Sequence, residues 1–305
     1  PLKDPDAPLV QVKAPGESKT MEHVIANYMN PGLTMKYHEP GVVTKITDDY
    51  IYYKTDSGET KKIGLFNHFP LNQDSFLQSR PTVAVGDKIK PGDILAENNF
   101  QKDGVLALGA NLRVAYMPWK GQTFEDSVVI TESAAQKLTS THIMKDELLL
   151  SKEGIQDVDK YNAYFPGNLT KENMEKLDEV GIIKEGQRVN PDEYIAIYME
   201  PRDLTDEEKI LKSMYKALTV PYVDRSLKWE HNLPGYVRYV RNIGNKVSFT
   251  IEVEAPTEIG DKLVGRYGNK GIVSKIIPDS EAPHTKDGER VDVLLSPFGY
   301  PGRTN

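Results

Sequence analysis

The segment DKLVGRYGNKG, residues 261–271, places Lys262, Arg266 and Lys270 among three glycines in a chain of formal net charge −7. Lysine supplies a long point charge and arginine a planar fork of donors, and both suit phosphate. Glycine lets a backbone approach a bulky anion. The segment is not a Walker loop, because neither Ser nor Thr follows the lysine. It therefore predicts a small phosphate-binding loop, with a solvated basic loop as the alternative.

Two adjacent acids, Glu125 and Asp126, lie in the stretch MPWKGQTFEDSVVITE, before an apolar run. On an extended backbone their side chains point to opposite faces, which excludes a glycosidase-type carboxylate pair. One acid could reach a metal or a metal-bound triphosphate while the other organises the loop; an ordinary acidic turn is the alternative. Arg303, in the segment SPFGYPGRTN, adds another planar cation suited to phosphate.

The composition limits the kinds of protein to which these residues can belong. The chain has 305 residues, 38% of them hydrophobic, so it is long enough to bury a core. It has no cysteine and six scattered histidines, which excludes thiolate metal sites and leaves carboxylates as the expected ligands of any metal. No run of about 18 apolar residues is present, and PLKDPDAPLVQ lacks the layout of a signal peptide. We therefore expect a cytoplasmic protein without membrane contact.

Much of the chain shows strand patterns. Residues 41–53 are rich in β-branched and aromatic residues, and residues 57–69 continue an extended pattern after an Asp-Ser-Gly turn. The pattern G-x-x-[IV]-x-P-x-[DE]-x-[IL]-A begins at Gly86 and again at Gly186. Its strand-like partner precedes the first copy and follows the second, which predicts two similar β units in permuted order. Two copies of a common turn are the alternative.

Three short helices are expected. One covers residues 19–29, and a second begins at Thr170 and stops at Gly181, a plausible C-terminal cap. A third begins at Thr205, which forms a capping box with Glu208. Its apolar stripe consists of Ile210, Leu211, Met214, Tyr215 and Leu218. The residues thus predict a protein that is mainly β with short helices.

In order and spacing, these segments resemble the second-largest (β) subunit of multisubunit DNA-directed RNA polymerases in its bacterial type. LGANLRVAYMPWKGQTFEDSVVITE is similar to the family's segment around its FED acids, and EIGDKLVGRYGNKGIVSKI to its GDK and GRHGNKG segment. VDVLLSPFGYPGRTN is similar to its NPLG-P-SRMN stretch, and the segments between resemble the family's flap. The resemblance is collinear over about residues 40–305.

The resemblance implies a fold with a double-psi β-barrel, sandwich-barrel hybrid units and an inserted flap. Residues 1–139 would hold one barrel half, the first hybrid unit and the FED loop. Residues 140–250 would form the flap with its tip helix. Residues 251–305 would hold the second barrel half with the GDK/GNKG loop and the PGRTN segment.

By the same resemblance, the chain would take part in RNA synthesis with two Mg²⁺ ions, one held permanently by a β′ subunit. Glu125 and Asp126 would lie near the second, nucleotide-borne Mg²⁺. Phosphates of the incoming triphosphate, the RNA 3′ end or the initiating nucleotide would meet Lys262, Arg266, Lys270 and Arg303. Such groups neutralise charge on the reactants of a two-metal displacement.

The resemblance also implies partners. The tip helix would present Ile210, Leu211, Met214 and Tyr215 to a sigma-like initiation factor; packing of this stripe on the flap itself is the alternative. The other partners would be the β′-like subunit, the remaining part of β, the assembly subunits, the DNA template, RNA and nucleoside triphosphates. We expect a piece of a larger subunit or a naturally split subunit, inactive alone because the permanent metal site would lie on another chain.

Several residues depart from the family pattern. Tyr267 stands where the bacterial family has His, and PGRTN and WKGQTFED replace PSRMN and WNGYNFED. This divergence suggests a viral or plasmid-borne enzyme. Two rival functions are a carrier domain, with a modified Lys36 in TMKYHEP, and a stand-alone flap-like adaptor that binds a transcription factor. The adaptor would leave the GNKG loop and the FED acids unexplained.

Overall fold

The structure is a computed structural model that describes residues 1–16, 18–29, 39–205, 207–210, 221–299 and 301–302. The chain divides into two compact units, the first formed by Pro1–Thr141 with Ala255–Asn305 and the second by His142–Glu254. The elements are mainly strands with few short helices, which confirms the expected fold class at this level. Within the described residues, no helix has both the length and the apolar character needed to span a membrane.

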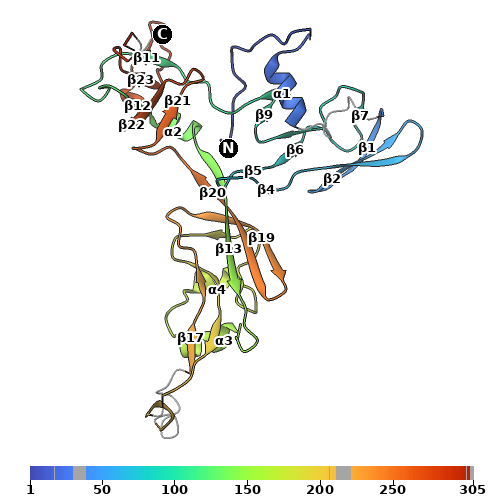
Figure 1. The fold of residues 1–305 in the computed structure, drawn as a ribbon, viewed down its shortest axis with the longest axis vertical. Helices are drawn as coiled ribbons and strands as arrows, with labels where there is room; N and C mark the ends of the chain where they lie inside the picture. The colour runs from blue at the N-terminus through green and yellow to red at the C-terminus, as the bar shows by residue number, and fades with distance from the viewer. Residues whose placement is uncertain (17, 30–38, 206, 211–220, 300, 303–305) are drawn as a thin grey trace. The chain divides into compact units, whose positions relative to one another are not determined.

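A five-stranded sheet in the first unit joins segments that are far apart in the sequence (Figure 1). Its order is β11 (Val114–Tyr116), β23 (Val293–Leu295), β12 (Ser127–Thr131), β22 (Lys270–Ile277) and β21 (Lys262–Val264). The central strand β12 is apolar on both faces, since Val128 and Ile130 pack in one core and Val129 in another. Thr131 ends the strand and caps helix α2 (Glu132–Lys137). Burial on both faces fixes β12 as the centre of the sheet.

A four-stranded sheet forms a second part of this unit. Its order is β3 (Thr60–Gly64), β2 (Tyr50–Thr55), β1 (Gly41–Ile46) and β7 (Lys88–Ile89). Ile51 and Tyr53 of β2 pack with Val43, Ile63 and Ile89 from the other strands in one core. Alternate residues of β2 are less buried, the pattern of a sheet with one face on a core.

Helix α1 (Met21–Met29) and short strand pairs complete the first unit, and α1 confirms the helix expected at residues 19–29. The amide of Gln101 donates to the carbonyl of Ala26 at 2.5 Å and ties α1 to β9. The other elements are β4 (Phe69–Pro70), β5 (Phe76–Leu77), β6 (Ser79–Pro81), β8 (Ala96–Asn98), β9 (Gln101–Lys102), β10 (Val105–Leu106) and η3 (Asp279–Glu281).

The second unit is built around another four-stranded sheet, whose order is β13 (Ser140–Leu149), β20 (Lys246–Ala255), β19 (Gly235–Ile243) and β14 (Arg188–Val189). Its core includes the fully buried Trp229, Phe249 and Ile195. The other elements are α3 (Val158–Tyr164), α4 (Lys171–Lys176), β15 (Tyr194–Ala196), β16 (Met199–Pro201), β17 (Tyr222–Asp224) and β18 (Leu227–Lys228).

The two copies of the G-x-x-[IV]-x-P pattern make the same backbone hydrogen bonds. In each copy the first glycine donates to a strand valine, and that valine donates to the carbonyl of the next pattern residue. These bonds are Gly86 N to Val43 O (2.8 Å), Val43 N to Asp87 O (2.9 Å), Gly186 N to Val237 O (2.7 Å) and Val237 N to Gln187 O (2.9 Å). A bulge follows the valine in both copies. Strand β1 precedes the first copy of the pattern, whereas β19 follows the second copy. The two copies therefore make the same strand pairing in permuted order, as predicted.

Helix α4 begins where predicted but ends earlier. The Thr170 hydroxyl accepts a hydrogen bond from the Asn173 amide at 3.1 Å and caps the helix, which ends at Lys176. Gly181 was therefore the wrong end residue. It lies in a later turn with φ +88°, where a Cβ atom would come within 3.0 Å of the Cβ of Ile197. This turn against Ile197, rather than the helix end, requires glycine.

Candidate functional site

Three sequence motifs meet at one edge of the five-stranded sheet. Strand β12 begins directly after Glu125 and Asp126 and pairs parallel with β22, which begins at Lys270. Parallel strands start at the same edge of a sheet, so the acids and the lysine come to that edge together. Strand β23 runs antiparallel to β12, and its carboxyl end therefore delivers residues 296–299 to the same place. Figure 1 shows these strands adjacent in the first unit.

The acidic pair lies in a tight turn, which corrects the extended backbone assumed from the sequence. Glu125 has φ +51°, and the amide of Ser127 donates to the carbonyl of Phe124 at 3.0 Å. Both acids are exposed. A residue other than glycine seldom adopts this left-handed backbone conformation, which costs about 1 kcal/mol or more. The turn is held because the Asp126 carbonyl accepts from the Ile272 amide of β22 at 2.9 Å.

The glycines of the basic segment serve close approaches and turns within the chain. A Cβ atom on Gly271 would lie 2.7 Å from the carbonyl oxygen of Asp126 and 2.5 Å from Val128 Cγ2. Gly268 has φ +82° in the hairpin turn, and a Cβ on Gly265 would overlap the side chain of Asn269. The sequence interpretation that these glycines let the backbone approach a bound anion stays a prediction. Within the chain, Gly271 lets strand β22 lie against the acidic turn.

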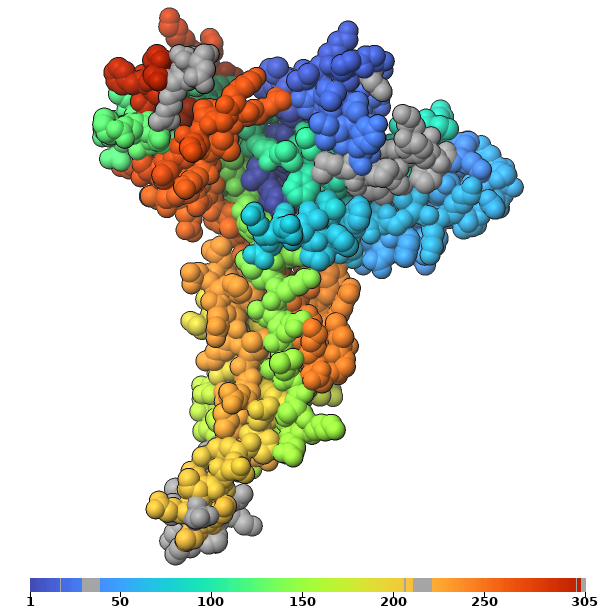
Figure 2. Space-filling view, viewed as in Figure 1, coloured from blue at the N-terminus to red at the C-terminus, as the bar shows by residue number. Residues whose placement is uncertain are grey.

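The two lysines share one face of the hairpin formed by β21 and β22. Lys262 pairs with Ile272 and Val264 with Lys270, so these four side chains are on the same face. Leu263, between them in β21, points to the opposite face and packs on the core. Both lysines are exposed. The hairpin lies in the orange surface of the first unit in Figure 2. It thus carries two positive charges toward solvent beside the acidic turn.

Arg266, at the tip of this hairpin, is bound to the amino-terminal part of the unit. Its Nη2 donates to Glu22 Oε1 at 3.0 Å, and its Nη1 donates to the carbonyl of Val10. The Glu22 side chain is only 9% exposed, and its Oε2 accepts from the Val12 amide at 3.0 Å. Burial acts to raise the pKa of Glu22, but the backbone amides and Arg266 outweigh it and hold that pKa below its usual value. Glu22 was missed in the sequence, since an acid early in a helix is commonplace there.

The remaining predicted site residues lie mostly outside the described residues: Leu211, Met214, Tyr215 and Arg303. The start of the third predicted helix is described and its capping box is present. The Thr205 amide donates to Glu208 Oε2 at 3.0 Å, and the Glu208 amide donates to the Thr205 hydroxyl at 3.3 Å. Ile210, the first residue of the apolar stripe, is 61% exposed.

The carboxylates at this edge are the candidate ligands of a metal ion. Among the described residues, no cluster of three or more His, Asp or Glu side chains could hold a metal. Glu125 and Asp126 supply two exposed carboxylates at the edge of the sheet. A pair of this kind fits a metal that arrives with other ligands, such as the phosphates of a nucleotide, because Mg²⁺ is commonly held by one or two carboxylates and substrate phosphates.

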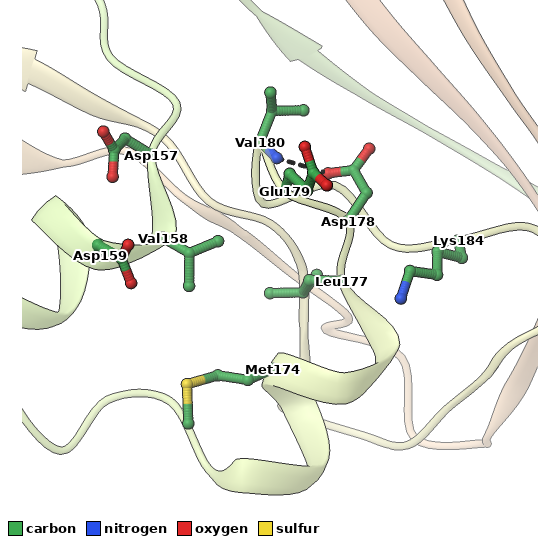
Figure 3. A pocket seen from close by; sticks show the side chains of 9 residues that line it. All are labelled: Asp157, Val158, Asp159, Met174, Leu177, Asp178, Glu179, Val180 and Lys184. Atoms are coloured by element: carbon green, nitrogen blue, oxygen red, sulfur yellow. Dashed lines mark hydrogen bonds between the residues drawn. The ribbon is translucent and has the colours of Figure 1, made fainter.

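A surface pocket of about 780 Å³ lies in the second unit (Figure 3). It is lined by Asp157, Val158, Asp159, Met174, Leu177, Asp178, Glu179, Val180 and Lys184. The Asp178 carboxylate accepts from the Val180 amide at 3.1 Å, and the Asp157 carboxylate caps α3. Two of its acids therefore hold local backbone, and the pocket contains none of the predicted site residues.

The sequence of the chain matches a known protein family. The family model described as "RNA polymerase Rpb2, domain 6" matches residues 35–305 of this chain. The chain therefore belongs to the RNA polymerase Rpb2 domain 6 family, as the sequence resemblance predicted.

Its relatives are named as polymerase subunits. It is 35% identical to the DNA-directed RNA polymerase subunit beta of Heterosigma akashiwo, over 88% of this chain and 25% of that protein. It is 32% identical to the same-named subunit of Chloroflexus aggregans, over the whole of this chain and 25% of that protein. It is 30% identical to the same-named subunit of Syntrophomonas wolfei, over 98% of this chain and 28% of that protein. The chain thus spans about a quarter of the length of these curated relatives.

Proposed function

We propose that this chain forms part of the catalytic core of a DNA-dependent RNA polymerase and contributes to nucleotidyl transfer. One observation carries the proposal. Glu125, Asp126, Lys270 and residues 296–299, which the sequence separates widely, meet at one sheet edge, and the three charged side chains are exposed. The membership of the chain in the polymerase family supports the same conclusion.

The lysines are the proposed phosphate contacts. Lys262 and Lys270 would bind phosphates of the RNA 3′ end or of the initiating nucleotide, and Arg303 would bind the incoming triphosphate. Cations placed before the reaction begins stabilise the charge that develops on transferring phosphoryl groups. Arg266 was predicted to join them, but its ion pair with Glu22 favours a role in holding the hairpin tip.

Magnesium would supply Lewis-acid stabilisation of the reacting phosphates. Glu125 and Asp126 would approach an ion carried by the nucleotide, directly or through water. A β′-like partner would hold the other ion, so this chain alone would not make RNA. The DNA template and the remaining polymerase subunits are the other proposed partners, and the cytoplasm is the proposed location.

The second unit would act as the flap and dock a sigma-like initiation factor. The capping box at Thr205 and Glu208 starts a helix whose first apolar residue, Ile210, is exposed. An exposed apolar helix face is suited to a groove on a partner. We also propose that the first unit contains the double-psi β-barrel of the family. The repeated strand pairing would then mark the sandwich-barrel hybrid units.

The test is an assembly experiment with the full chain. The tagged chain is purified from its native source, and the complex is assayed for template-dependent RNA extension, with the isolated chain as the control. We expect a β′-like chain to be retained and extension in the complex only. A solitary chain with a mass shift on Lys36 would instead support a carrier domain; Lys36 itself lies outside the described residues.

A further inference from the structure

The four-stranded sheet of the first unit has a strongly basic outer face. Its core side is formed by residues such as Val43 and Ile51. The outer side, called the lysine face below, carries Lys45, Tyr50, Tyr52, Lys54, Lys62 and Lys88. All four of these lysines are exposed, and none of the four strands contains Asp or Glu.

The strand register shows that these side chains form one surface. Tyr52 of β2 is opposite Lys45 of β1 on one side and Lys62 of β3 on the other. Val42 of β1 is likewise flanked by Lys54 and Lys88. Residues directly opposite one another in antiparallel strands point to the same face. The lysine face therefore extends across the whole sheet, whose strands β1, β2 and β7 are labelled in Figure 1.

The tyrosines hold the ammonium groups at this surface. Lys62 Nζ lies 4.3 Å from the ring centroid of Tyr50, and Lys45 Nζ lies 5.9 Å from that of Tyr52. The two ring centroids are 6.0 Å apart. Contact with an aromatic face orients a cation but leaves its charge uncompensated. Among the described residues these lysines make no ion pair with a carboxylate, so their positive charge remains for an external anion.

The second copy of the sheet shows that the fold does not require this charge. Glu252 of β20 occupies the position equivalent to Lys54, because each is opposite the residue before the strand valine. Arg238 Nε donates to the Glu252 carboxylate at 2.8 Å. One copy of the same pairing thus carries an internal ion pair, while the other gathers lysines in a chain of net charge −7.

We propose that the lysine face binds a single strand of nucleic acid, with its phosphates on the lysines and its bases against Tyr50 and Tyr52. A positively charged surface with interleaved aromatic rings is the usual platform for single strands, whose unpaired bases are free to stack. A duplex would use the charges but not the rings. The proposal does not rest on the catalytic role of Lys262 and Lys270, which lie on a different sheet.

The test measures binding of a fluorescent single-stranded DNA of about 15 nucleotides to the full chain by anisotropy at several salt concentrations. Lys54→Gln with Lys62→Gln removes two proposed phosphate contacts and should make the slope of log K against log salt shallower by about 1.4. The matched control, Lys275→Gln with Lys286→Gln, removes two exposed lysines elsewhere in the first unit and should leave the slope unchanged. The comparison is repeated in a chain that also carries Lys262→Ala and Lys270→Ala. This distinguishes binding at the lysine face from binding at the hairpin formed by β21 and β22.

Two further variants distinguish the charge of the lysine face from its aromatic rings. Lys54→Glu places a glutamate where the equivalent strand already has Glu252, so the fold should tolerate it. Binding should weaken more than in Lys54→Gln. Tyr52→Leu should weaken single-strand binding at least about 5-fold with an unchanged salt slope, because it removes stacking but no charge. An unchanged slope in the double lysine variant would overturn the site. Equal binding of a duplex, with no effect of Tyr52→Leu, would overturn the assignment to single strands.

Discussion

Arg266 and Glu22 are 244 residues apart in the sequence and form an ion pair at 3.0 Å. The tip of the basic hairpin is thereby anchored to the amino-terminal part of the first unit. Glu22 is itself fixed by the Val12 amide, so the anchor is a connected set of hydrogen bonds. This anchor restrains the hairpin that carries Lys262 and Lys270, while leaving both lysines exposed.

Replacing Glu22 by Gln should reduce stability above about pH 4.5, and this reduction should shrink progressively as the pH falls below that value. The pKa of Glu22 is held below its ordinary value of 4.5, so the stabilisation is present above that pH and is lost as the pH falls through the lower folded pKa. We expect a loss of about 1.5–3 kcal/mol at pH 7, typical of a hydrogen bond to a charged group. Urea unfolding across this pH range measures it. Glu258→Gln, at an exposed glutamate, is the control; equal losses in both variants would refute the anchor.

Replacing Lys262 or Lys270 by Ala in an assembled polymerase should lower kcat/KM for RNA extension by about 10- to 100-fold, because one charge-assisted contact to phosphate is lost. Single-turnover extension at several nucleotide concentrations measures this effect. Assembly should be intact, since both side chains are exposed. Lys275→Ala, in the same strand but away from the edge, should extend RNA normally. Wild-type kinetics in both lysine variants would remove the phosphate assignment.

Replacing Gly271 by Ala should displace the acidic turn. The new Cβ would lie 2.7 Å from the Asp126 carbonyl oxygen, and a backbone atom cannot move aside as the end of a flexible side chain can. We expect a stability loss of about 1–3 kcal/mol with a fall in extension activity of the assembled enzyme. Gly109→Ala is the matched control, because a Cβ there meets no atom within 4 Å. Full activity in Gly271→Ala would show that the turn need not be held in place.

Replacing Met214 and Tyr215 together by Ser should impair promoter-directed initiation and spare elongation. Both residues lie outside the described residues, and the prediction follows from the proposed docking of an initiation factor on the helix that begins at Thr205. Initiation from a promoter and elongation from a preassembled scaffold are compared on the same enzyme preparation. Equal loss of both activities would indicate that the stripe packs within its own unit.

The sequence by itself determined the features that depend on neighbours along the chain. Thr170 caps α4, and Thr205 and Glu208 form a capping box, because each bond spans only three residues. The repeated G-x-x-[IV]-x-P pattern also specified its turn and strand locally. Even here the sequence misplaced the end of α4 at Gly181. A glycine is required there by a turn packed against Ile197 and not by the end of the helix.

Only the tertiary structure decided how the motifs combine. The parallel pairing of β12 with β22 places the acidic turn against Gly271, and the partner of Arg266 comes from the other end of the chain. Neither contact is encoded by spacing, since strand order in a sheet depends on which apolar faces bury one another. The lysine face arises in the same way, because its charges come from four separate strands that only the sheet register brings together.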